Sequence, residues 1–364
     1  MPNDNVVSPT YSSAGVRRFG RLKTLLFSVI IMVLFFGAAE TIVRFWVYFL
    51  REPAERFDIE TGTFVLLPGR HTRLGAGTIT VNSRGFVGAE FEDPAPSGVT
   101  RIVSVGDSCT FGGGTSATTY PGQLELQLNE SGKRRFQVIN AGIEGLNSDL
   151  ALRRLVTKVL PLKPDVITIY IGWNDLMKFD PEGQRETPGL AVIARLMDQL
   201  WLTKALRKFV FFYLRPHIST PATGATSRTG AFRDYRPAVF EQTFRTLVAT
   251  ARRSGARVLV MTLPSVVSID MTPEDLRRSH VVFPYFRSAY AVGDFVDLID
   301  AYNESIRKIA NEHDVVTVDL ASQIDRRSDR RALFFDTMHP NQQGKELIAQ
   351  ILKRELQEKR IVVR

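Results

Sequence analysis

Short runs rich in β-branched residues alternate with longer amphipathic stretches from about residue 100 to the end of the chain. Strand and helix alternating in this way are typical of an α/β fold, in which helices cover both faces of a central parallel sheet. Five strands are predicted, at 101–105, 137–141, 166–171, 257–262 and 315–319. The predicted helices are 120–129, 148–159, 240–254, 298–313 and 342–358. In such sheets functional groups gather at the carboxyl ends of the strands.

Composition excludes several other classes of protein. The chain has 364 residues, of which 44% are hydrophobic and 23% charged, so it can bury a sizeable core and is neither disordered nor fibrous. Its single cysteine, Cys109, excludes an internal disulfide and a cysteine metal site. The net charge of +9 is spread along the chain without a nucleic-acid-binding motif. We therefore expect a solvated basic surface and no nucleic-acid partner.

An uncharged apolar run, residues 24–39, lies near the N-terminus. It is slightly shorter than the ~20 residues that span a bilayer, but apolar residues continue with Ile42 and Val43. Glu40 and Arg44 are four residues apart on such a helix and can pair at its outer edge. Four basic residues precede the run: Arg17, Arg18, Arg21 and Lys23.

A basic flank before an apolar helix keeps the N-terminus in the cytoplasm and sends the following chain across the membrane. We therefore predict a cytoplasmic leader (1–23), a single-pass transmembrane signal anchor (24–49) and a periplasmic remainder. A cleaved signal peptide is the alternative, because Gly37, Ala38 and Ala39 are small residues of the kind found at cleavage sites. A buried core helix is less favoured, because the run has no polar face.

The rest of the chain divides at about residue 100. Residues 50–99 are rich in Pro, Gly and turn formers, which favours a stalk ending in an accessory hairpin, and 100–364 form the α/β domain. Two long connections, 178–237 and 264–294, are typical of lids or binding loops. The first is a helical insertion with an apolar face in its run 190–214. This helix either packs on the core, covers the site as a lid, or dips into the membrane surface.

A serine follows the first strand of the predicted sheet, in the run Gly106-Asp107-Ser108. Serine is a weak nucleophile unless a base removes its proton. Of the five histidines, only His339 has a carboxylate three residues before it, Asp336. On a tight turn this carboxylate can accept the proton of one ring nitrogen and leave the other nitrogen facing Ser108. We therefore predict a nucleophile, a base and its orienting group at the carboxyl edge.

An acyl-transfer site also needs donors for the negative charge that develops on the carbonyl oxygen. The second strand is followed by a turn that ends at Gly145, and the third by Gly172-Trp173-Asn174. Gly145 can present a backbone N–H and Asn174 a side-chain amide, and Ser108 can add its own N–H. We predict these three groups as an oxyanion hole.

Four short motifs follow one another in order along the chain. They are Gly-Asp-Ser after the first strand, a glycine after the second, Gly-x-Asn-Asp after the third and Asp-x-x-His near the end. Over about residues 101–356 this set resembles the block pattern of the SGNH (GDSL) hydrolases. The resemblance implies a three-layer α/β/α sandwich with a parallel sheet of about five strands, and hydrolysis of carboxylic esters. It implies Ser108 as nucleophile, His339 as base and Asp336 as its partner, with Gly145 and Asn174 in the oxyanion hole. The leader and residues 82–85 look like those of bacterial membrane-anchored members.

Other interpretations of individual motifs are less favoured. Glycines 112–114 lack the Lys-Ser/Thr of a P-loop and are interpreted as a rim beside the serine. Cys109 is interpreted as a buried small residue rather than a thiol nucleophile. Asp107 and Asp175 are interpreted as structural groups that hold loop backbone. No metal and no cofactor is expected, because the remaining histidines lack ligand spacing: His71, His217, His280 and His313.

These observations favour a membrane-anchored serine esterase that removes acyl or acetyl groups from an ester-bearing glycan or lipid outside the cytoplasmic membrane. An O-acyltransferase acting on a cell-envelope polysaccharide is an alternative, because it would use the same acyl-serine intermediate. A non-catalytic glycan-binding or assembly module is a third, and the intact set of site residues argues against it. The sequence leaves the oligomeric state open.

Overall fold

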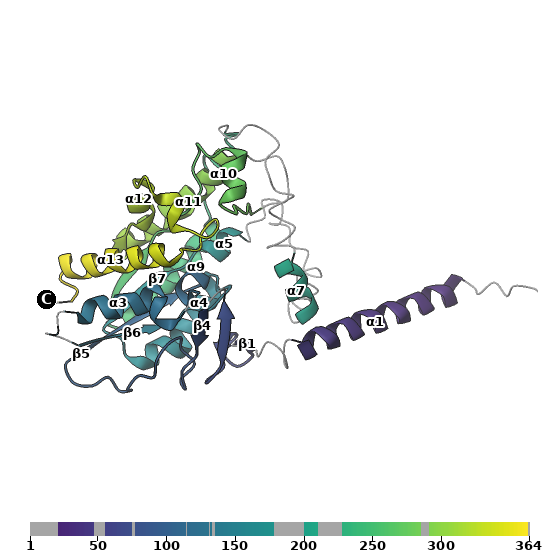
Figure 1. The fold of residues 1–364 in the computed structure, drawn as a ribbon, viewed down its shortest axis with the longest axis horizontal. Helices are drawn as coiled ribbons and strands as arrows, with labels where there is room; N and C mark the ends of the chain where they lie inside the picture. Colours follow the sequence, from purple (N-terminus) through teal and green to yellow (C-terminus); the bar gives the residue numbers. More distant parts are fainter. Residues whose placement is uncertain are drawn as a thin grey trace, which may run out of the picture.

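A five-stranded parallel sheet forms the centre of the protein in the computed structural model, which describes residues 21–46, 55–74, 77–113, 115–130, 132, 135–177, 200–209, 228–284 and 291–362 (Figure 1). Its strand order is β6-β5-β7-β8-β9. The bounds are β5 Val99–Gly106, β6 Arg135–Asn140, β7 Val166–Tyr170, β8 Arg257–Met261 and β9 Val316–Val318. All five predicted strands are confirmed, with ends within two residues.

The strand order brings three carboxyl ends together. β5 pairs with β6 on one side and with β7 on the other, in a register that places Ser104 beside Asn140 and Gly106 beside Tyr170. The chain leaves β5 toward β6 and returns past β5 to β7, so the direction of the crossovers reverses here. A site at this edge is therefore bounded by the loops after β5, β6 and β7.

Helices cover both faces of the sheet, as predicted. On one face α3 (Tyr120–Asn129) packs against α13 (Gln342–Glu358), and both bounds agree with the prediction. The other layer contains α4 (Ser148–Arg154), α9 (Ala238–Arg253) and α11 (Val292–Glu312). The helix α4 ends earlier than predicted, in a π-helical turn at 155–159, and α11 begins six residues earlier than predicted. The fold is the predicted three-layer α/β/α sandwich.

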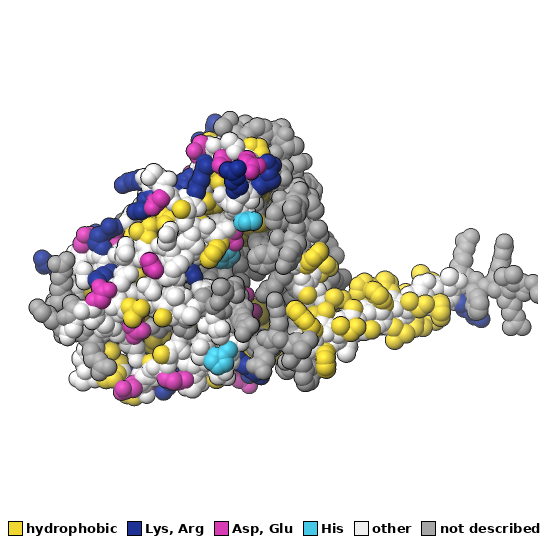
Figure 2. Space-filling view, in the orientation of Figure 1, with side chains coloured by type: hydrophobic (Ala, Val, Ile, Leu, Met, Phe, Trp, Pro, Cys, Tyr) yellow, Lys and Arg dark blue, Asp and Glu magenta, His cyan; other side chains and the backbone are white. Residues whose placement is uncertain are grey.

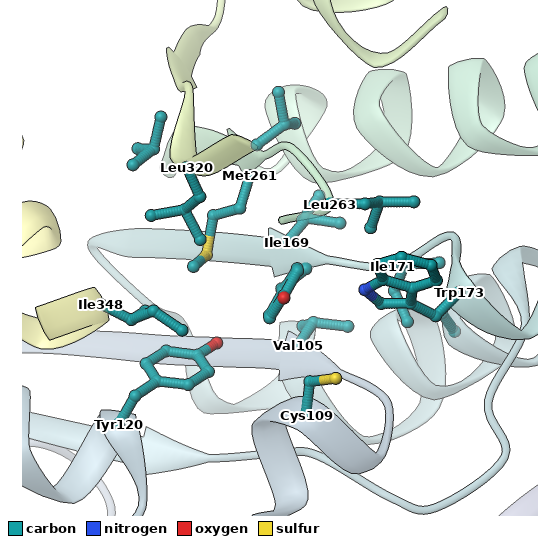
Figure 3. Close-up of a cluster of buried hydrophobic side chains, with 14 of the residues drawn as sticks. Val105, Cys109, Tyr120, Ile169, Ile171, Trp173, Met261, Leu263, Leu320 and Ile348 are labelled. Atoms are coloured by element: carbon teal, nitrogen blue, oxygen red, sulfur yellow. The ribbon is translucent and has the colours of Figure 1, made fainter. Parts of the chain in front are cut away.

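The core lies between the sheet and these two layers (Figure 3). Tyr120 from α3, Ile348 from α13, Met261 from β8 and Leu320 from α12 (Leu320–Asp325) belong to the cluster drawn there. Each of these side chains is fully buried. Burial of a side chain of this size stabilises the fold by about 1.5–3 kcal/mol. Packing therefore stabilises this domain, whose one cysteine cannot form a disulfide within the chain.

The segment before β5 differs from the predicted stalk. It forms two antiparallel hairpins rather than one, with strands β1 Glu55–Asp58, β2 Thr63–Leu66, β3 His71–Leu74 and β4 Gly77–Thr80. Ile79, Val81 and Phe86 are buried in the core of the domain, and the Val87 N–H donates to the Asn140 carbonyl at 3.1 Å. In the sequence Ile79 and Val81 alternate with Thr78 and Thr80, which favours a hairpin strand, but a stretch of four residues does not predict that it docks on the domain.

Shorter elements complete the described structure. They are the α-helices α2 Ser108–Phe111, α5 Trp173–Met177, α7 Trp201–Phe209, α10 Pro273–Arg278 and α12 Leu320–Asp325, and the 3-10 turns Ser116–Thr118, Leu160–Leu162 and Arg330–Leu333. Of the predicted insertion 178–237, the structure describes 200–209 and 228–237. The remainder of the predicted helix 190–214 lies outside the described residues.

The N-terminal helix α1 (Arg21–Phe45) projects away from the domain (Figure 1). Its segment Lys23–Phe45 has 23 residues and a mean hydropathy of 2.3, and its apolar side chains are exposed over the visible face (Figure 2). This is the one helix in the described part of the chain that is long and apolar enough to cross a membrane, as a single span or a signal sequence. The predicted Glu40–Arg44 pair is confirmed at 2.7 Å.

Candidate active site

Ser108 is the first residue of α2, directly beyond the carboxyl end of β5. Asp107 caps this short helix, since its Oδ1 accepts the Cys109 N–H at 2.9 Å. Gly106 allows the tight turn, because a Cβ there would lie 1.7 Å from Thr110 Oγ1. The Ser108 N–H lies in the first helical turn, where backbone N–H groups have no acceptor within the helix. The serine thus presents both a hydroxyl and an N–H at the edge of the sheet.

His339 and Asp336 meet Ser108 from the far end of the chain. Ser108 Oγ lies 2.8 Å from His339 Nε2, and His339 Nδ1 lies 2.8 Å from Asp336 Oδ2. The Asp336 Oδ1 atom also accepts the backbone N–H groups of Met338 at 3.0 Å and His339 at 2.9 Å. The carboxylate therefore holds both the ring and the backbone of its histidine. The structure brings all three residues of the predicted triad into one hydrogen-bonded chain.

The carboxylate and the imidazole shift each other's pKa. Burial lowers the pKa of His339, but the hydrogen bond and negative charge of Asp336 outweigh it, so this pKa lies above its ordinary value. Burial raises the pKa of Asp336, and hydrogen bonds from the His339 ring and backbone outweigh it, so this pKa lies below its ordinary value. Asp336 is thus ionised at neutral pH, and it stabilises an imidazolium at His339.

Thr337 lies in the turn between Asp336 and His339 and bonds this turn to the long connection 264–294. Its Oγ1 accepts the Val282 N–H at 2.7 Å, and its carbonyl accepts the Ser265 hydroxyl at 2.8 Å. All three residues are buried. This support is not predictable from the sequence, because an isolated threonine between two candidate residues gives no signal of its partners.

Gly145 lies in the loop after β6, and Asn174 lies in α5 directly after β7, on either side of the strand that leads to Ser108. Gly145 is exposed, and its φ of +75° is a conformation that favours glycine. Asn174 Nδ2 donates to the Leu146 carbonyl at 3.0 Å and, over a longer distance of 3.3 Å, to Asp107 Oδ2. The amide is thus held between the loop of Gly145 and the residue before Ser108. The three predicted oxyanion donors share one edge of the sheet.

Asp107 and Asp175 hold loop backbone, as interpreted from the sequence. Burial raises the pKa of Asp107 to about 6, against the opposing effect of the Cys109 N–H. Asp175 accepts the Ser148 N–H at 2.9 Å and the Ser148 hydroxyl at 2.6 Å, at the first residue of α4. This contact joins the loop after β7 to the loop after β6, on either side of the candidate oxyanion hole.

Arg154 is a buried residue that supports the loop after β6. Its side chain is 1% exposed, and burial lowers its pKa to about 9. The Nε–H donates to the Ala141 carbonyl at 2.7 Å, and the guanidinium lies 5.5 Å from the centre of the Phe86 ring. The arginine therefore holds the start of the loop that carries Gly145 against the accessory segment, residues 50–99, which contains Phe86. Nothing in the sequence around Arg154 distinguishes it from the arginines that lie on the surface.

Cys109 points into the core, close to Val105 in the cluster of buried side chains (Figure 3). It is 1% exposed, its thiol donates to the Met338 carbonyl at 3.5 Å, and burial raises its pKa well above the ordinary value. A protonated, buried thiol is a poor nucleophile, which agrees with its interpretation as a core residue. Among the described residues, no group of three or more His, Cys, Asp and Glu side chains is placed to hold a metal ion.

Residues 104–347 match the model of the GDSL-like lipase/acylhydrolase family, which is more than half of the chain. The chain belongs to this family. It is therefore a hydrolase that acts on ester bonds, and the resemblance drawn from the four sequence blocks is confirmed. The matched region begins within β5 and ends within α13, so it contains every residue of the candidate site.

Solved structures with a similar fold include a lipase/acylhydrolase from Enterococcus faecalis, with 18% identity over 71% of this chain and 96% of that one, at a TM-score of 0.43. The acetyl xylan esterase AlAXEase has 18% identity over 71% and 100% of the two chains, at a TM-score of 0.42. The acetylxylan esterase Axe2 from Geobacillus stearothermophilus has 19% identity over 71% and 94%, at a TM-score of 0.42. No curated protein matches the sequence.

Proposed function

We propose that this protein is a membrane-anchored serine esterase with Ser108 as nucleophile, His339 as general base and Asp336 as its orienting partner. The observation that carries the proposal is the chain of 2.8 Å contacts from Ser108 Oγ through the His339 ring to Asp336. These three residues lie at the carboxyl edge of the sheet, where the direction of the crossovers reverses between β6 and β7. The protein belongs to a family of ester hydrolases.

In the first half of the reaction, Ser108 Oγ attacks the ester carbonyl carbon while its proton moves to His339 Nε2. The resulting tetrahedral intermediate collapses when the imidazolium gives this proton to the leaving alkoxide. An alcohol departs and an acyl-serine remains. Water then repeats the sequence with His339 as base, releasing the carboxylic acid and restoring the serine. Asp336 stays ionised throughout and stabilises the imidazolium in both halves.

The negative oxygen of each tetrahedral intermediate would be bound by the N–H groups of Ser108 and Gly145 and by the Asn174 amide. One hydrogen of Asn174 Nδ2 is held by the Leu146 carbonyl at 3.0 Å, which orients the amide. The other makes the longer contact with Asp107 Oδ2, at 3.3 Å. The oxyanion can replace this weaker partner, so the donor is oriented before the charge develops.

The proposed layout of the chain follows from the candidate span. Residues 1–23 form a cytoplasmic leader, 24–49 the anchor, 50–99 the accessory segment, and 100–364 the hydrolase domain with its insertion 178–237. The basic flank orients the domain toward the periplasm. The proposed substrate is accordingly an acyl or acetyl ester carried by an extracytoplasmic glycan or lipid.

A covalent probe tests the proposal. The full-length protein in detergent is incubated with a fluorophosphonate and, in parallel, assayed on p-nitrophenyl acetate. We expect mass spectrometry to place the adduct on Ser108, and Ser108→Ala to lose both labelling and turnover. Ser83→Ala, which removes an exposed hydroxyl bonded to Glu90, is the control and should keep both. Labelling of another residue, or retained turnover in Ser108→Ala, would remove Ser108 as nucleophile.

A further inference from the structure

The described part of the insertion is tied to the outer end of the N-terminal helix. The Glu40 carboxylate in α1 accepts the N–H of Trp201 at 3.0 Å and the N–H of Leu202 at 2.7 Å. These are the first two residues of α7, so Glu40 satisfies N–H groups that have no acceptor within that helix. Its negative charge also lies at the positive end of the helix dipole. Among the described elements, α7 packs chiefly on α1.

This contact fixes the depth of α7 relative to a membrane that α1 would cross. Lys23 and Glu40 are separated by 17 residues of continuous helix, a rise of about 26 Å. The hydrocarbon core of a bilayer is about 30 Å thick. With Lys23 at the inner boundary, Glu40 and the start of α7 therefore lie within about 4 Å of the outer boundary, close to where the lipid headgroups begin.

The helix α7 separates its apolar and basic positions. At 100° per residue, Trp201, Leu202, Ala205, Leu206 and Phe209 fall on one side of the helix. Of the basic positions, Lys204 and Arg207 fall on the opposite side of this pattern, and Lys208 falls at its border, next to Trp201. Trp201 and Leu202 are partly covered, whereas Leu206 is 58% and Phe209 51% exposed. A nine-residue helix thus carries an apolar face that is partly exposed at Leu206 and Phe209, beside the proposed anchor.

A lipid surface fits this face better than water or the protein interior does. The headgroup region accepts apolar side chains on one side of a helix and attracts lysine and arginine on the other. The apolar face is also adjacent to the exposed side chains of α1, which lipid would surround. Figure 2 shows hydrophobic side chains on the visible face of α1, in contrast to the mixed polar surface of the domain.

We propose that α7 is an interfacial helix, which lies in the headgroup region of the outer leaflet with Leu206 and Phe209 inserted into the bilayer. This rests on the membrane anchoring in the proposed function, but not on its chemistry. The insertion leaves the catalytic edge at the end of α5, the helix that carries Asn174. The proposal therefore ties the oxyanion side of the site to the membrane surface and favours an ester presented by a lipid or a lipid-linked glycan.

The returning end of the insertion is bonded to the domain through α11. Asp294, fully buried at the start of α11, accepts the Thr229 N–H at 2.8 Å, the Thr229 hydroxyl at 2.9 Å and the Gly230 N–H at 3.2 Å. Arg228 pairs with Asp297 at 3.0 Å. Residues 228–230, at the returning end of the insertion, are thus held by α11.

Three leucines of similar exposure allow a matched test. Leu34 in α1 is 66% exposed, Leu206 in α7 58%, and Leu126 in α3, on the body of the domain, 55%. Each is changed to cysteine in the full-length protein and labelled with an environment-sensitive fluorophore, while the native Cys109 is too buried to react. The labelled proteins are placed in vesicles of phosphatidylethanolamine and phosphatidylglycerol, with and without brominated phosphatidylcholine as a quencher within the bilayer.

We expect the probes at positions 34 and 206 to be blue-shifted and quenched by the brominated lipid, and the probe at 126 to be unaffected. An unquenched probe at 206 overturns the proposal, whether its emission is that of water or is blue-shifted by protein packing, as in a lid or a core helix. Quenching of the probe at position 34 tests separately whether α1 lies in the bilayer. Turnover of p-nitrophenyl acetate by the same proteins reports on the esterase chemistry independently of both probes.

Discussion

The protonation state of His339 controls the proposed chemistry, because the base must be neutral to accept the serine proton. Asp336 holds the pKa of His339 above its ordinary value of 6.5. We therefore expect kcat/KM to rise with pH through a midpoint above 6.5. Asp336→Asn removes the charge that raises this pKa, so the midpoint should move to lower pH while turnover falls on the order of 10³–10⁴-fold. Profiles of p-nitrophenyl acetate hydrolysis measure both effects, and an unmoved midpoint would contradict the pairing.

Asn174 should contribute chiefly in the transition state, when the carbonyl oxygen becomes negative. Replacing it with alanine removes one donor, so kcat is expected to fall about 10²–10³-fold with a smaller change in KM. The melting temperature of Asn174→Ala should be measured alongside, because the amide also bonds to the Leu146 carbonyl. A loss confined to KM would assign Asn174 to substrate binding instead.

Asp107 should make stability depend on pH in a direction opposite to that of most carboxylates. Burial raises its pKa in the folded state from 3.8 to about 6, so the folded state binds a proton more tightly than the unfolded state. Stability from this group is thus present below pH 3.8 and is lost as pH rises to about 6, by about 3 kcal/mol in total. Urea unfolding of the wild type and of Asp107→Asn should show free energies that diverge over this window, in favour of the variant. Parallel curves would exclude the raised pKa.

At the residue scale, the candidate catalytic residues could be predicted from the sequence, whereas the residues that hold them in place could not. Ser108, His339 and Asn174 each follow a predicted strand or stand in a motif with a chemical reason. Thr337 and Arg154 do not, since their roles depend on partners from distant segments that only the packed structure brings close. Burial of an arginine cannot be read from a pattern in which most arginines are solvated.

At the element scale, Arg154 joins the accessory segment to the loop after β6, and its neighbour provides a control. Arg154→Ala leaves the buried Ala141 carbonyl without this donor, so the free energy of unfolding should fall by about 1–3 kcal/mol. Turnover should fall as well, because the same loop carries Gly145. Arg153, which is half exposed and pairs with Asp149, should change stability by under about 0.5 kcal/mol when replaced by alanine. Equal effects of the two substitutions would refute this role.

The elements that were predicted well are those with a strong period. The five strands are short, β-branched and buried, and α3 and α13 begin and end at the predicted residues. The accessory segment was predicted less well, because its burial comes from single apolar residues such as Ile79 and Phe86 that dock on the domain. The alternating stretch 78–81 favours a strand, but its four residues are too few to show that the strand packs on the domain.

At the scale of the whole molecule, contacts across long stretches of sequence decide how the parts are connected. Glu40 accepts the N–H of Trp201, which is 161 residues further along the chain, and no periodicity or motif predicts that the two meet. Asp294 likewise joins the two long connections by bonds to Thr229. The sequence predicted that these connections serve the site, but which surfaces they join depends on tertiary packing.

The topology of the intact protein gives the last prediction. If α1 is an uncleaved anchor, the full-length protein should remain with membranes after a carbonate wash, because a hydrophobic span resists extraction that releases peripheral proteins. A protease added to spheroplasts should then digest the hydrolase domain, while an epitope placed before Met1 stays protected on the cytoplasmic side. Permeabilised spheroplasts, in which the epitope is also digested, are the control. A soluble mature form whose N-terminus lies near Glu40 would instead establish cleavage, and the proposed anchor and the depth of α7 inferred from it would both be withdrawn.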